Sequence, residues 1–347
     1  MRIPGLDIQR KKAVLILGAG ASRGAGCFRN TLLPPPLDTD FFSLLERVQH
    51  RDRALKQLLE FVKSEFGEAA FPRMEELFTQ IEALSEFHEN LNITPGPRVT
   101  RYRRQLDAFV GNIARFFHHV FIDAASGVHR TCEHHDRIAE LLHAEDAVVT
   151  FNYDCLMDDA LRRKAGRGWD PKISYGFEIQ EAAATEWRPQ TPKGRPARTP
   201  IALLKLHGSL NWDRSAGSEA IHLVLRGDPY THSGRTAAEV VPPVWDKTIK
   251  EDEVLKQIWK EARRTLPTGP VLLSVGYSVP PTDLLSQALI RVAASERAEN
   301  QKLSHVIVVN PDIQARRRLI NLVQGGMNAG TSVIELNTLS ELSRLLH

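Results

Sequence analysis

Cysteine is scarce in this sequence of 347 residues, which holds only Cys27, Cys132 and Cys155. No two of these residues form a C-x-x-C pair, so neither a disulfide framework nor a four-cysteine zinc site can be built. We therefore expect no bound metal. So few thiols suit a reducing compartment, and we expect a cytoplasmic protein.

Long apolar runs and a charge surplus are missing as well. No run approaches the ~20 apolar residues that span a bilayer, and the first residues, MRIPGLDIQRKK, lack the apolar region of a signal peptide. The 45 Lys and Arg against 42 Asp and Glu leave a formal charge of +3, too little to predict a nucleic-acid or membrane surface. With 42% hydrophobic and 25% charged residues, the composition is that of a globular protein of roughly two domains.

The residues that are present alternate between strand-like and helical patterns. The apolar run from Ala13 to Leu17 ends in a glycine-rich turn, which predicts a buried strand that feeds a tight turn. Further strand-like runs occupy residues 147–151, 203–206, 271–275 and 306–309, and helical stretches occupy residues 252–264, 284–298 and 313–323. The alternation predicts a Rossmann-like α/β fold, in which helices cover both faces of a mainly parallel sheet.

A block of helical period interrupts this pattern after the first strand. It predicts helices over residues 41–66, 74–87 and 102–122 and leaves little room for strands. We interpret residues 38–130 as a helical insertion. The remaining residues, 1–37 and 131–347, then form one discontinuous nucleotide-binding domain.

Two kinds of segment are predicted to lie on the surface. Residues 186–200 are rich in Pro and Arg without periodicity, which is typical of an exposed loop. The basic clusters at residues 101–104, 162–164 and 316–318 are interpreted as solvated helix faces. Contact of one cluster with nucleic acid or an acidic partner stays open.

Five predicted strand ends carry glycines and polar residues. Parallel sheets bind ligands beyond the carboxyl ends of their strands, so these motifs are candidates for a ligand site. In chain order they are Gly18-Ala19-Gly20-Ala21-Ser22, Thr150-Phe151-Asn152-Tyr153-Asp154, His207-Gly208-Ser209, Gly276-Tyr277-Ser278 and Val309-Asn310. The glycines of the first turn let the backbone approach a pyrophosphate, and the Ser22 hydroxyl can donate to it. Arg23 stands where the dehydrogenase fingerprint G-x-G-x-x-G has its third glycine, which disfavours hydride transfer.

Taken in order, these motifs resemble the sirtuin family, and in particular its prokaryotic sirtuin-like branch, which is associated with NAD depletion in antiviral defence. The resemblance covers residues 11–30 and 145–335 and implies a sirtuin-type fold that binds NAD. The sequence departs from the family in three ways. It lacks the four-cysteine zinc ribbon of sirtuin deacylases, its Gly26-Cys27-Phe28-Arg29 keeps only part of their turn after the phosphate loop, and Tyr153 replaces an aliphatic residue. These departures disfavour protein deacylation and favour plain cleavage of NAD.

The resemblance implies a role for each motif residue. His207 is the general base, which takes a proton from a ribose hydroxyl or from water, and Asn152 orients the ribose and the attacking water. Asp154 binds the nicotinamide carboxamide, and Asn310 contacts the adenosine ribose. The other cofactor-binding residues are Gly18, Ala19, Gly20, Ser22, Phe28, Gly276 and Ser278.

The same residues also have purely structural interpretations. His207 could be a hydrogen-bonded core residue, and Asn310 could belong to a simple turn. Asn152 and Asp154 could be turn and cap residues of a helix over residues 155–164.

Hydrolysis of NAD to nicotinamide and ADP-ribose is the predicted function, as the NAD-depleting effector of an antiviral defence system. A nucleotide-binding sensor or assembly module without turnover is the alternative, and a zinc-free protein deacylase is a third candidate. A pure binder needs the phosphate loop but no base at the sugar, so Asn152 and His207 together favour the enzyme.

Aromatic residues in the predicted insertion bear on its partners. The stripe of Phe109, Phe116, Phe117 and Phe121 offers more apolar surface than one helix needs on its own domain. We expect the insertion to cover the NAD crevice or to form the subunit interface of a homo-oligomer. The resemblance adds a separately encoded partner such as an ATP-driven DNA translocase, which some relatives use. Alternatively, the aromatic residues complete the domain's own core.

Overall fold

Runs rich in Val, Ile and Leu form the strands of a central sheet in the computed structural model. The structure describes residues 1, 3, 11–28, 31–67, 70–91, 93–94, 96–180, 184–190, 199–215, 220–231, 236–240 and 252–347. Within these residues the sheet has six strands, β1 (Ala13–Leu17), β2 (Ala147–Thr150), β3 (Ala202–Lys205), β7 (Val271–Val275), β8 (His305–Val309) and β9 (Ser332–Leu336). Their order is β3-β2-β1-β7-β8-β9, and every neighbouring pair is parallel. The predicted Rossmann-like α/β fold is confirmed.

Strand β1 lies at the point where the strand order reverses. Leu15 pairs with Val148 of β2 on one side and with Leu273 of β7 on the other. Strand β3 continues the sheet beyond β2, and strands β8 and β9 continue it beyond β7 on the other side. A crevice therefore opens beyond the carboxyl ends of β1 and β7, where open parallel sheets bind their ligands.

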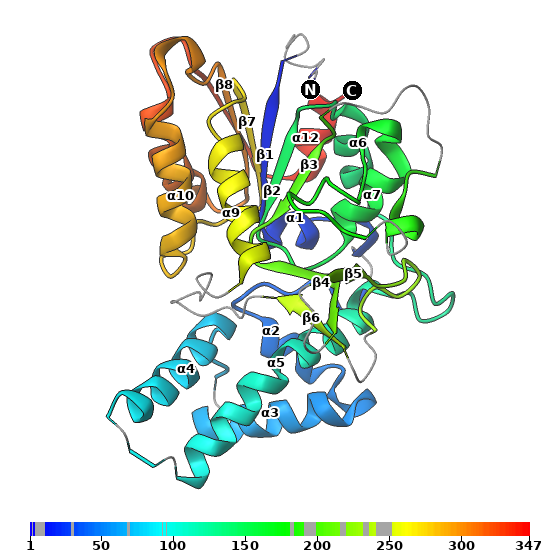
Figure 1. The fold of residues 1–347 in the computed structure, drawn as a ribbon, viewed down its shortest axis with the longest axis vertical. Helices are drawn as coiled ribbons and strands as arrows, with labels where there is room; N and C mark the ends of the chain where they lie inside the picture. Colours follow the sequence, from blue (N-terminus) through cyan, green and yellow to red (C-terminus); the bar gives the residue numbers. More distant parts are fainter. Residues whose placement is uncertain are drawn as a thin grey trace.

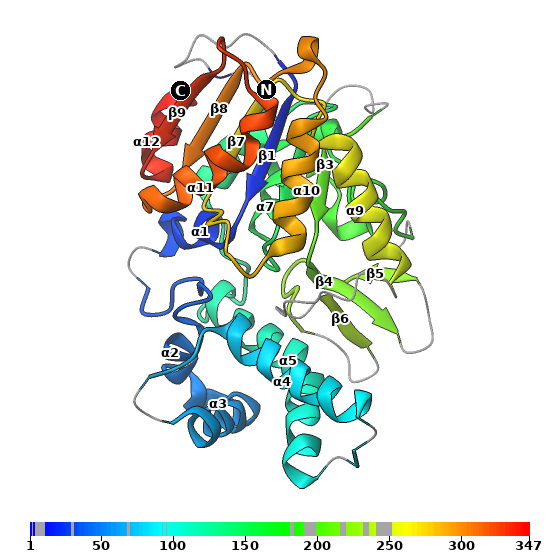
Figure 2. The ribbon, with the colours of Figure 1, turned by 90° about the vertical axis from the view of Figure 1, so that its left-hand side faces the viewer.

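Helices cover both faces of the sheet (Figures 1 and 2). One group is α9 (Glu253–Thr265), α10 (Leu284–Ser295) and α11 (Ile313–Val323), and the other is α6 (Glu133–Leu141), α7 (Leu156–Lys164) and α12 (Leu339–Leu345). The short α1 (Ala19–Arg23) follows β1 directly. Because both faces are covered, all five residues of β1 and of β7 are buried, which explains their uninterrupted apolar sequence.

Four of the described helices between β1 and β2 lie beyond the carboxyl edge of the sheet (Figures 1 and 2). They are α2 (Phe41–Glu46), α3 (Arg53–Phe66), α4 (Met74–Asn90) and α5 (Pro97–Phe121). The helix predicted over residues 41–66 is in fact two, because Asp52 accepts hydrogen bonds from the backbone N–H groups of Ala54 and Leu55 and starts α3. The division of the chain into an insertion and a discontinuous domain stays a prediction.

The aromatic stripe of α5 is buried inside the chain. Phe109, Phe116 and Phe121 are fully buried and Phe117 is 7% exposed. Phe116 packs on Phe41 of α2, with ring centroids 5.1 Å apart. The expected surplus of apolar surface on this helix is therefore wrong, because neighbouring segments of the same chain cover it. The homo-oligomer stays a prediction, but the aromatic stripe of α5 no longer supports it.

A second sheet was missed by the sequence patterns. Within the described residues it has three antiparallel strands in the order β5-β4-β6, formed by β4 (Gly208–Ser215), β5 (Ile221–Leu223) and β6 (Thr236–Val240). Strand β4 begins directly after His207, and α5 packs against β6. This small sheet therefore holds one side of the turn that carries the predicted base.

Two surface predictions need correction. Of the loop predicted over residues 186–200, residues 191–198 lie outside the described residues, while Trp187 is buried and its indole donates to the carbonyl of Val224 at 2.8 Å. Arg162 and Arg316 are buried rather than solvated. Ion pairs with Asp159 and Glu335 balance their charges.

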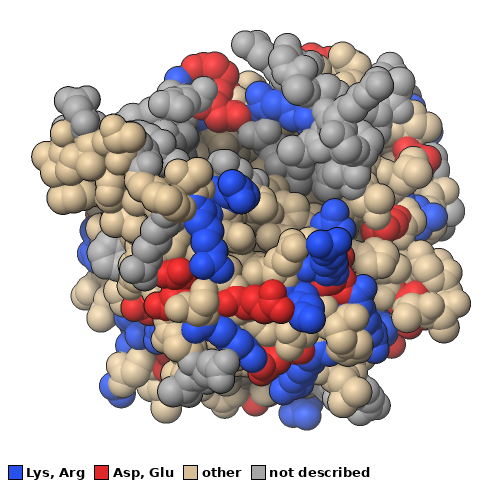
Figure 3. Space-filling model, turned by 90° about the horizontal axis from the view of Figure 1, so that it is seen from below, with Lys and Arg blue, Asp and Glu red and all other residues tan. Residues whose placement is uncertain are grey.

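The face seen from below, beyond α3 and α5, carries interspersed basic and acidic side chains (Figure 3). Ion pairs of α2, α3 and α5 include Lys63 with Glu46 and Arg115 with Asp52. Among the helices that the structure describes, none combines the length and the apolar character that a membrane span requires.

Candidate active site

Three glycines join the turns that follow β1 and β7. The N–H of Gly18 donates to the carbonyl of Val275, and the N–H of Gly20 donates to the carbonyl of Gly276, both at 3.0 Å. A Cβ atom on Gly276 would lie 2.1 Å from the backbone nitrogen of Ala21, and its φ of +63° also favours glycine. The two turns thus pack backbone against backbone, which only residues without side chains allow.

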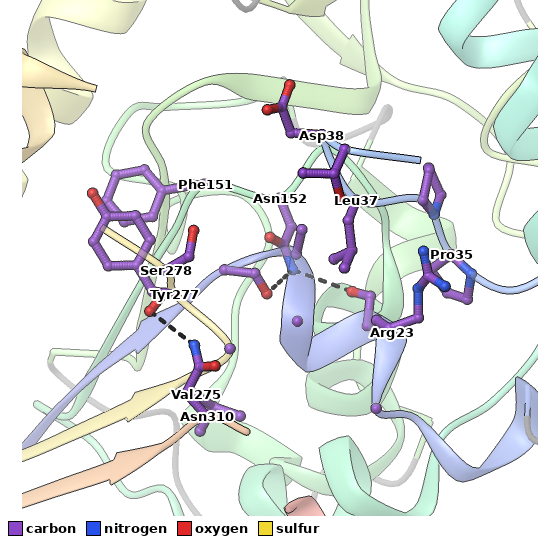
Figure 4. A pocket seen from close by; sticks show the side chains of 18 of the residues that line it. Arg23, Pro35, Leu37, Asp38, Phe151, Asn152, Val275, Tyr277, Ser278 and Asn310 are labelled. Atoms are coloured by element: carbon purple, nitrogen blue, oxygen red, sulfur yellow. Dashed lines mark hydrogen bonds between the residues drawn. The ribbon is translucent and has the colours of Figure 1, made fainter. Parts of the chain in front are cut away.

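A pocket of about 820 Å³ opens at this junction. Figure 4 shows the rings of Phe151 and Tyr277 on one side of it, Arg23 and Pro35 on the other, and Asn152 between them. The pocket is lined by all eleven predicted site residues, namely Gly18, Ala19, Gly20, Ser22, Phe28, Asn152, Asp154, His207, Gly276, Ser278 and Asn310. The fold therefore brings them to one place, while their individual roles stay predictions.

Asn152 lines this pocket and carries a buried hydrogen-bond acceptor without a partner among the described residues. Its Nδ2 donates to the carbonyl of Gly18 at 3.0 Å and to the Ser22 hydroxyl at 3.1 Å. Because the carbonyl can only accept, it fixes which end of the amide is the nitrogen. The opposite atom, Oδ1, is buried and has no hydrogen-bond partner among the described residues. A buried amide oxygen without a partner is costly, so a ligand that donates to it would be stabilised.

Asp154 is already engaged within the protein. Its Oδ2 accepts from the Ser22 hydroxyl at 2.6 Å, and its Oδ1 accepts from the N–H of Leu156, the first residue of α7, at 3.0 Å. The carboxylate thus stabilises the turn that leads into α7, whose N-cap residue is Cys155, and holds Ser22 against the β2 turn. This geometry matches the structural interpretation of Asp154, although the side chain also lines the pocket.

His207 lies against an aromatic wall. Its side chain is 8% exposed, and its ring centroid is 5.3 Å from that of Phe151 and 6.3 Å from that of Tyr153. Phe151 in turn stacks on Tyr277 at 4.3 Å. Burial raises the pKa of Tyr153, so this phenol stays neutral at physiological pH. The wall offers flat apolar faces to a planar ring beside the imidazole.

A buried lysine connects the β2 turn to β3. The Lys205 amine donates to the carbonyl of Asp154 at 2.7 Å and pairs with the Asp158 carboxylate at 3.0 Å, and both side chains of this ion pair are 1% exposed. Tyr175 donates to the other oxygen of Asp158 at 2.6 Å. Burial alone would lower the pKa of Lys205, but Asp158 raises it, so the amine stays charged. Lys205 therefore fixes the β2 turn relative to His207, two residues further along the chain.

The remaining predicted residues build the frame of the pocket. The Asn310 amide donates to the carbonyl of Tyr277 at 3.3 Å, and its oxygen accepts from the N–H of Asp312 at 3.0 Å, so it forms a turn. Ser278 is exposed, and its carbonyl accepts from Arg318. Phe28 is buried and meets Phe121 edge to face at 5.4 Å.

Charged residues from outside the motifs also line the pocket. Asp38 accepts from the N–H of Glu75 at 2.8 Å, and burial raises the pKa of Asp38. Arg23 forms an ion pair with Asp40, and Arg318 lies near the β7 turn. Asp38 and Glu75 belong to the helical segment between β1 and β2, and no local sequence pattern indicates that they reach the sheet. Among the described residues, no group of three or more His, Cys, Asp or Glu is arranged to hold a metal ion.

Comparison with known families identifies the class of protein that this fold and pocket define. A family model described as the SIR2-like domain matches residues 146–324, 179 of the 347 residues in the chain. The chain therefore belongs to the SIR2-like domain family. No curated protein matches it significantly.

Solved structures similar to the chain include Sir2 homologues. A Sir2 homologue in complex with NAD is 14% identical, with 97% of this chain and 89% of that chain covered and a TM-score of 0.46. A Sir2 homologue mutant in complex with 2′-O-acetyl-ADP-ribose is 15% identical, with 97% and 90% covered and a TM-score of 0.43. The family assignment rests on the domain model and not on these structural likenesses.

Proposed function

We propose that this protein hydrolyses NAD to nicotinamide and ADP-ribose. The observation that carries the proposal is the buried Oδ1 atom of Asn152, which has no hydrogen-bond partner among the described residues, on a residue that lines the same pocket as His207. Membership of the SIR2-like domain family supports NAD as the substrate. Sir2 homologues solved with NAD or with 2′-O-acetyl-ADP-ribose are consistent with this substrate.

Cleavage of NAD requires little acid catalysis, but it requires accurate placement of the ribose and the attacking water. Nicotinamide leaves NAD as a neutral molecule from a cationic ring, so the catalyst must stabilise the oxocarbenium-like ribose and supply water. The Asn152 oxygen accepts a hydrogen bond from a ribose hydroxyl or from the attacking water, and His207 takes the proton that this water loses. Such base catalysis typically contributes roughly 10²- to 10⁴-fold.

Charge in the pocket is distributed in a way that suits NAD. Arg23 and Arg318 supply positive charge for the pyrophosphate, while Asp38 and Glu75 complement the cationic nicotinamide ring. The stacked pair of Phe151 and Tyr277 offers a flat face for that ring. The amides of Gly18 and Gly20 are bonded to the β7 turn, so the glycines contribute close approach rather than free donors.

The cellular role belongs to the same proposal. The resemblance to the NAD-depleting branch of the sirtuins favours an antiviral effector that works with a separately encoded partner, such as an ATP-driven DNA translocase. Unregulated NAD hydrolysis would harm its host, so the pocket walls supplied by residues 38–130 are the place to look for control.

Product analysis of the purified chain tests the proposal. With NAD alone, we expect nicotinamide and ADP-ribose in equal amounts. Appearance of O-acetyl-ADP-ribose, together with faster turnover on addition of an acetylated peptide, would replace hydrolysis by deacylation. NAD that binds and stays intact would make the protein a sensor.

A further inference from the structure

Among the described residues, five carboxylates from different segments of the chain line the pocket. They are Asp38, Glu75, Asp154, Asp283 and Asp312. Three of them, Asp154, Asp283 and Asp312, accept hydrogen bonds on both of their oxygens from within the protein. Glu75 accepts a hydrogen bond from a hydroxyl of the loop after β7. These four carboxylates therefore already hold contacts between segments of the chain.

Asp38 is bonded on one carboxylate oxygen. Its Oδ1 accepts from the N–H of Glu75 at 2.8 Å, and its backbone carbonyl accepts from the N–H of Met74 at 3.1 Å. Asp38 thereby satisfies two backbone donors in the first turn of α4, donors that a helix leaves open at its start. The other carboxylate oxygen, Oδ2, makes no hydrogen bond of normal geometry with the residues that the structure describes. Asp38 thus lines the pocket with an acceptor that a ligand can use.

The charge of Asp38 reaches the aromatic wall of the pocket. Burial raises the pKa of Tyr153, and negative charge from Asp38 and two neighbouring carboxylates raises it further. Figure 4 shows the Asp38 carboxylate on the side of the view where Phe151 lies. Arg73 acts on Asp38 with the opposite charge, but Arg73 is exposed, so solvent screens it. A ring that stacks on the aromatic wall therefore lies within the field of Asp38.

We propose that Asp38 determines which base the protein removes, because its Oδ2 accepts a hydrogen bond from the carboxamide of NAD and repels a base that carries a carboxylate. This inference rests on the proposed function. The carboxamide of NAD offers two N–H donors, and its ring is cationic. A carboxylate in the same place can only accept, and it would bring a second negative charge against Asp38.

The motif residue Asp154 is less suited to this contact. It already accepts from the Ser22 hydroxyl at 2.6 Å and from the N–H of Leu156 at 3.0 Å. A carboxamide bonded to Asp154 would compete with these donors, which join the turn after β1 to the start of α7. Oδ2 of Asp38 has no such bond to give up. The carboxamide contact that the sequence motif suggests for Asp154 is therefore assigned to Asp38, which belongs to the segment between β1 and β2.

Hydrolysis of NAD and of nicotinic acid adenine dinucleotide, measured side by side on the full chain, tests this assignment. The wild type should show a kcat/KM at least roughly tenfold higher for NAD. Asp38→Asn keeps an oxygen that accepts from Glu75 and replaces Oδ2 by a donor. The ratio of the two kcat/KM values should therefore fall toward one, with a higher KM for NAD and better use of the analogue. A purely structural role of Asp38 would lower both values alike, and an unchanged ratio would overturn the proposal.

Two further variants sharpen the comparison. Glu76→Gln is the matched control, because it removes an exposed carboxylate from the same turn of α4, outside the lining of the pocket. Its ratio should equal that of the wild type. Asp154→Asn should lower stability and keep the ratio. A ratio that falls in Asp154→Asn and not in Asp38→Asn would return the carboxamide contact to Asp154.

Binding measured by calorimetry keeps this inference separable from the proposed function. If the wild type leaves both dinucleotides intact, the proposed hydrolysis fails, and the ratio of their dissociation constants decides the role of Asp38. Tighter binding of NAD than of the analogue, lost in Asp38→Asn, supports the selection. Equal affinity in the wild type, or binding of neither dinucleotide, would overturn it.

Discussion

The turns after β1 and β7 and the turns after β2 and β3 meet at one pocket, but they are built differently. The first pair is joined through the backbone, where Gly18, Gly20 and Gly276 leave no room for a Cβ atom. The second pair carries its function in side chains, with a buried acceptor on Asn152 that lacks a partner among the described residues, and with the His207 ring in the aromatic wall. The first region shapes the pocket, whereas the second supplies the side chains to which we assign the proposed chemistry.

This difference teaches how to interpret a motif residue. Gly276, Asp154 and Asn310 satisfy their hydrogen bonds within the protein, and so their loss should first affect folding. Asn152 keeps a buried polar atom without a partner among the described residues, a cost that is typical of a functional position. Substitutions at these two kinds of residue should therefore fail in different ways.

The largest effect is expected in the backbone junction. Gly276→Ala places a Cβ atom 2.1 Å from the Ala21 nitrogen and 2.3 Å from the Gly20 carbonyl carbon, at a φ of +63°. Overlap with backbone and the left-handed conformation together cost at least about 5 kcal/mol, enough to abolish the folded state. Circular dichroism and urea unfolding measure this loss.

Gly111→Ala is the matched control for that substitution. A Cβ atom added to Gly111 in α5 would have no neighbouring atom within 4 Å. We therefore expect the free energy of unfolding to rise by about 0.5 to 1 kcal/mol. If Gly276→Ala unfolds no more easily than the wild type, the backbone junction does not shape the pocket.

The next effect concerns the lysine that connects the β2 turn to β3. Lys205→Met leaves the Asp158 carboxylate buried without its cation and should cost about 3 to 5 kcal/mol in the free energy of unfolding. Adding Asp158→Asn removes the unpaired charge and should restore much of the stability. Turnover should stay low in the double variant, because the Asp154 carbonyl still lacks the donor that holds the turn. Full activity in the double variant would show that Lys205 does not position the site.

Side chains of the second region should affect kcat and not the fold. His207→Ala and Asn152→Ala should each lower kcat by at least roughly 10²-fold while both variants stay folded. Loss of the Asn152 amide bonds to Gly18 and Ser22 should lower the unfolding midpoint of Asn152→Ala, but not abolish its folding. Their effects should not add, since both residues serve one transition state. His50→Ala, on the exposed surface, is the control. Wild-type kcat in either site variant would remove that residue from the mechanism.

The smallest effect is a pH dependence of stability at the edge of the site. Burial lowers the pKa of His129, which bonds to Tyr230 at 2.8 Å. Below about pH 6.5 the unfolded chain binds a proton that the folded chain rejects, so stability falls with decreasing pH, by up to about 1.4 kcal/mol per pH unit. Urea midpoints between pH 7.5 and 5.5 should fall less in His129→Gln than in the wild type. Equal slopes would contradict this assignment.

Much of the fold and the position of the site could be predicted from the sequence. The apolar runs of β1 and β7 are long enough to indicate buried strands, and parallel strands bring their carboxyl ends to one edge. That rule alone gathers Gly18, Asn152 and His207 in one pocket. The hydrogen bond from Ser22 to Asp154 could not be predicted, because it depends on how Ser22 approaches the turn before α7.

Features that depend on packing between distant segments were missed. Asp38 and Glu75 reach the pocket only because α4 begins beside the loop that follows β1. The hydrophobic periodicity of a single segment does not predict such a contact between segments. The aromatic stripe of α5 suggested either a cover over the NAD crevice or a subunit interface. Phe117 and Phe121 line the pocket, whereas Phe41 of the same chain covers Phe116. Strand β4 was not predicted, because it buries the polar residues Ser209 and Asn211 and so lacks an apolar pattern. These two side chains are hydrogen bonded to each other at 2.5 Å.

One measurement tests the central claim most directly: binding of NAD by calorimetry and release of nicotinamide, measured together on the wild type, Asn152→Ala and His207→Ala. If the side chains after β2 and β3 catalyse hydrolysis, the wild type should bind NAD and release nicotinamide and ADP-ribose in equal amounts. Both variants should still bind NAD while they lose turnover. A wild type that binds NAD and leaves it intact, or variants that release nicotinamide as fast as the wild type, would contradict the account.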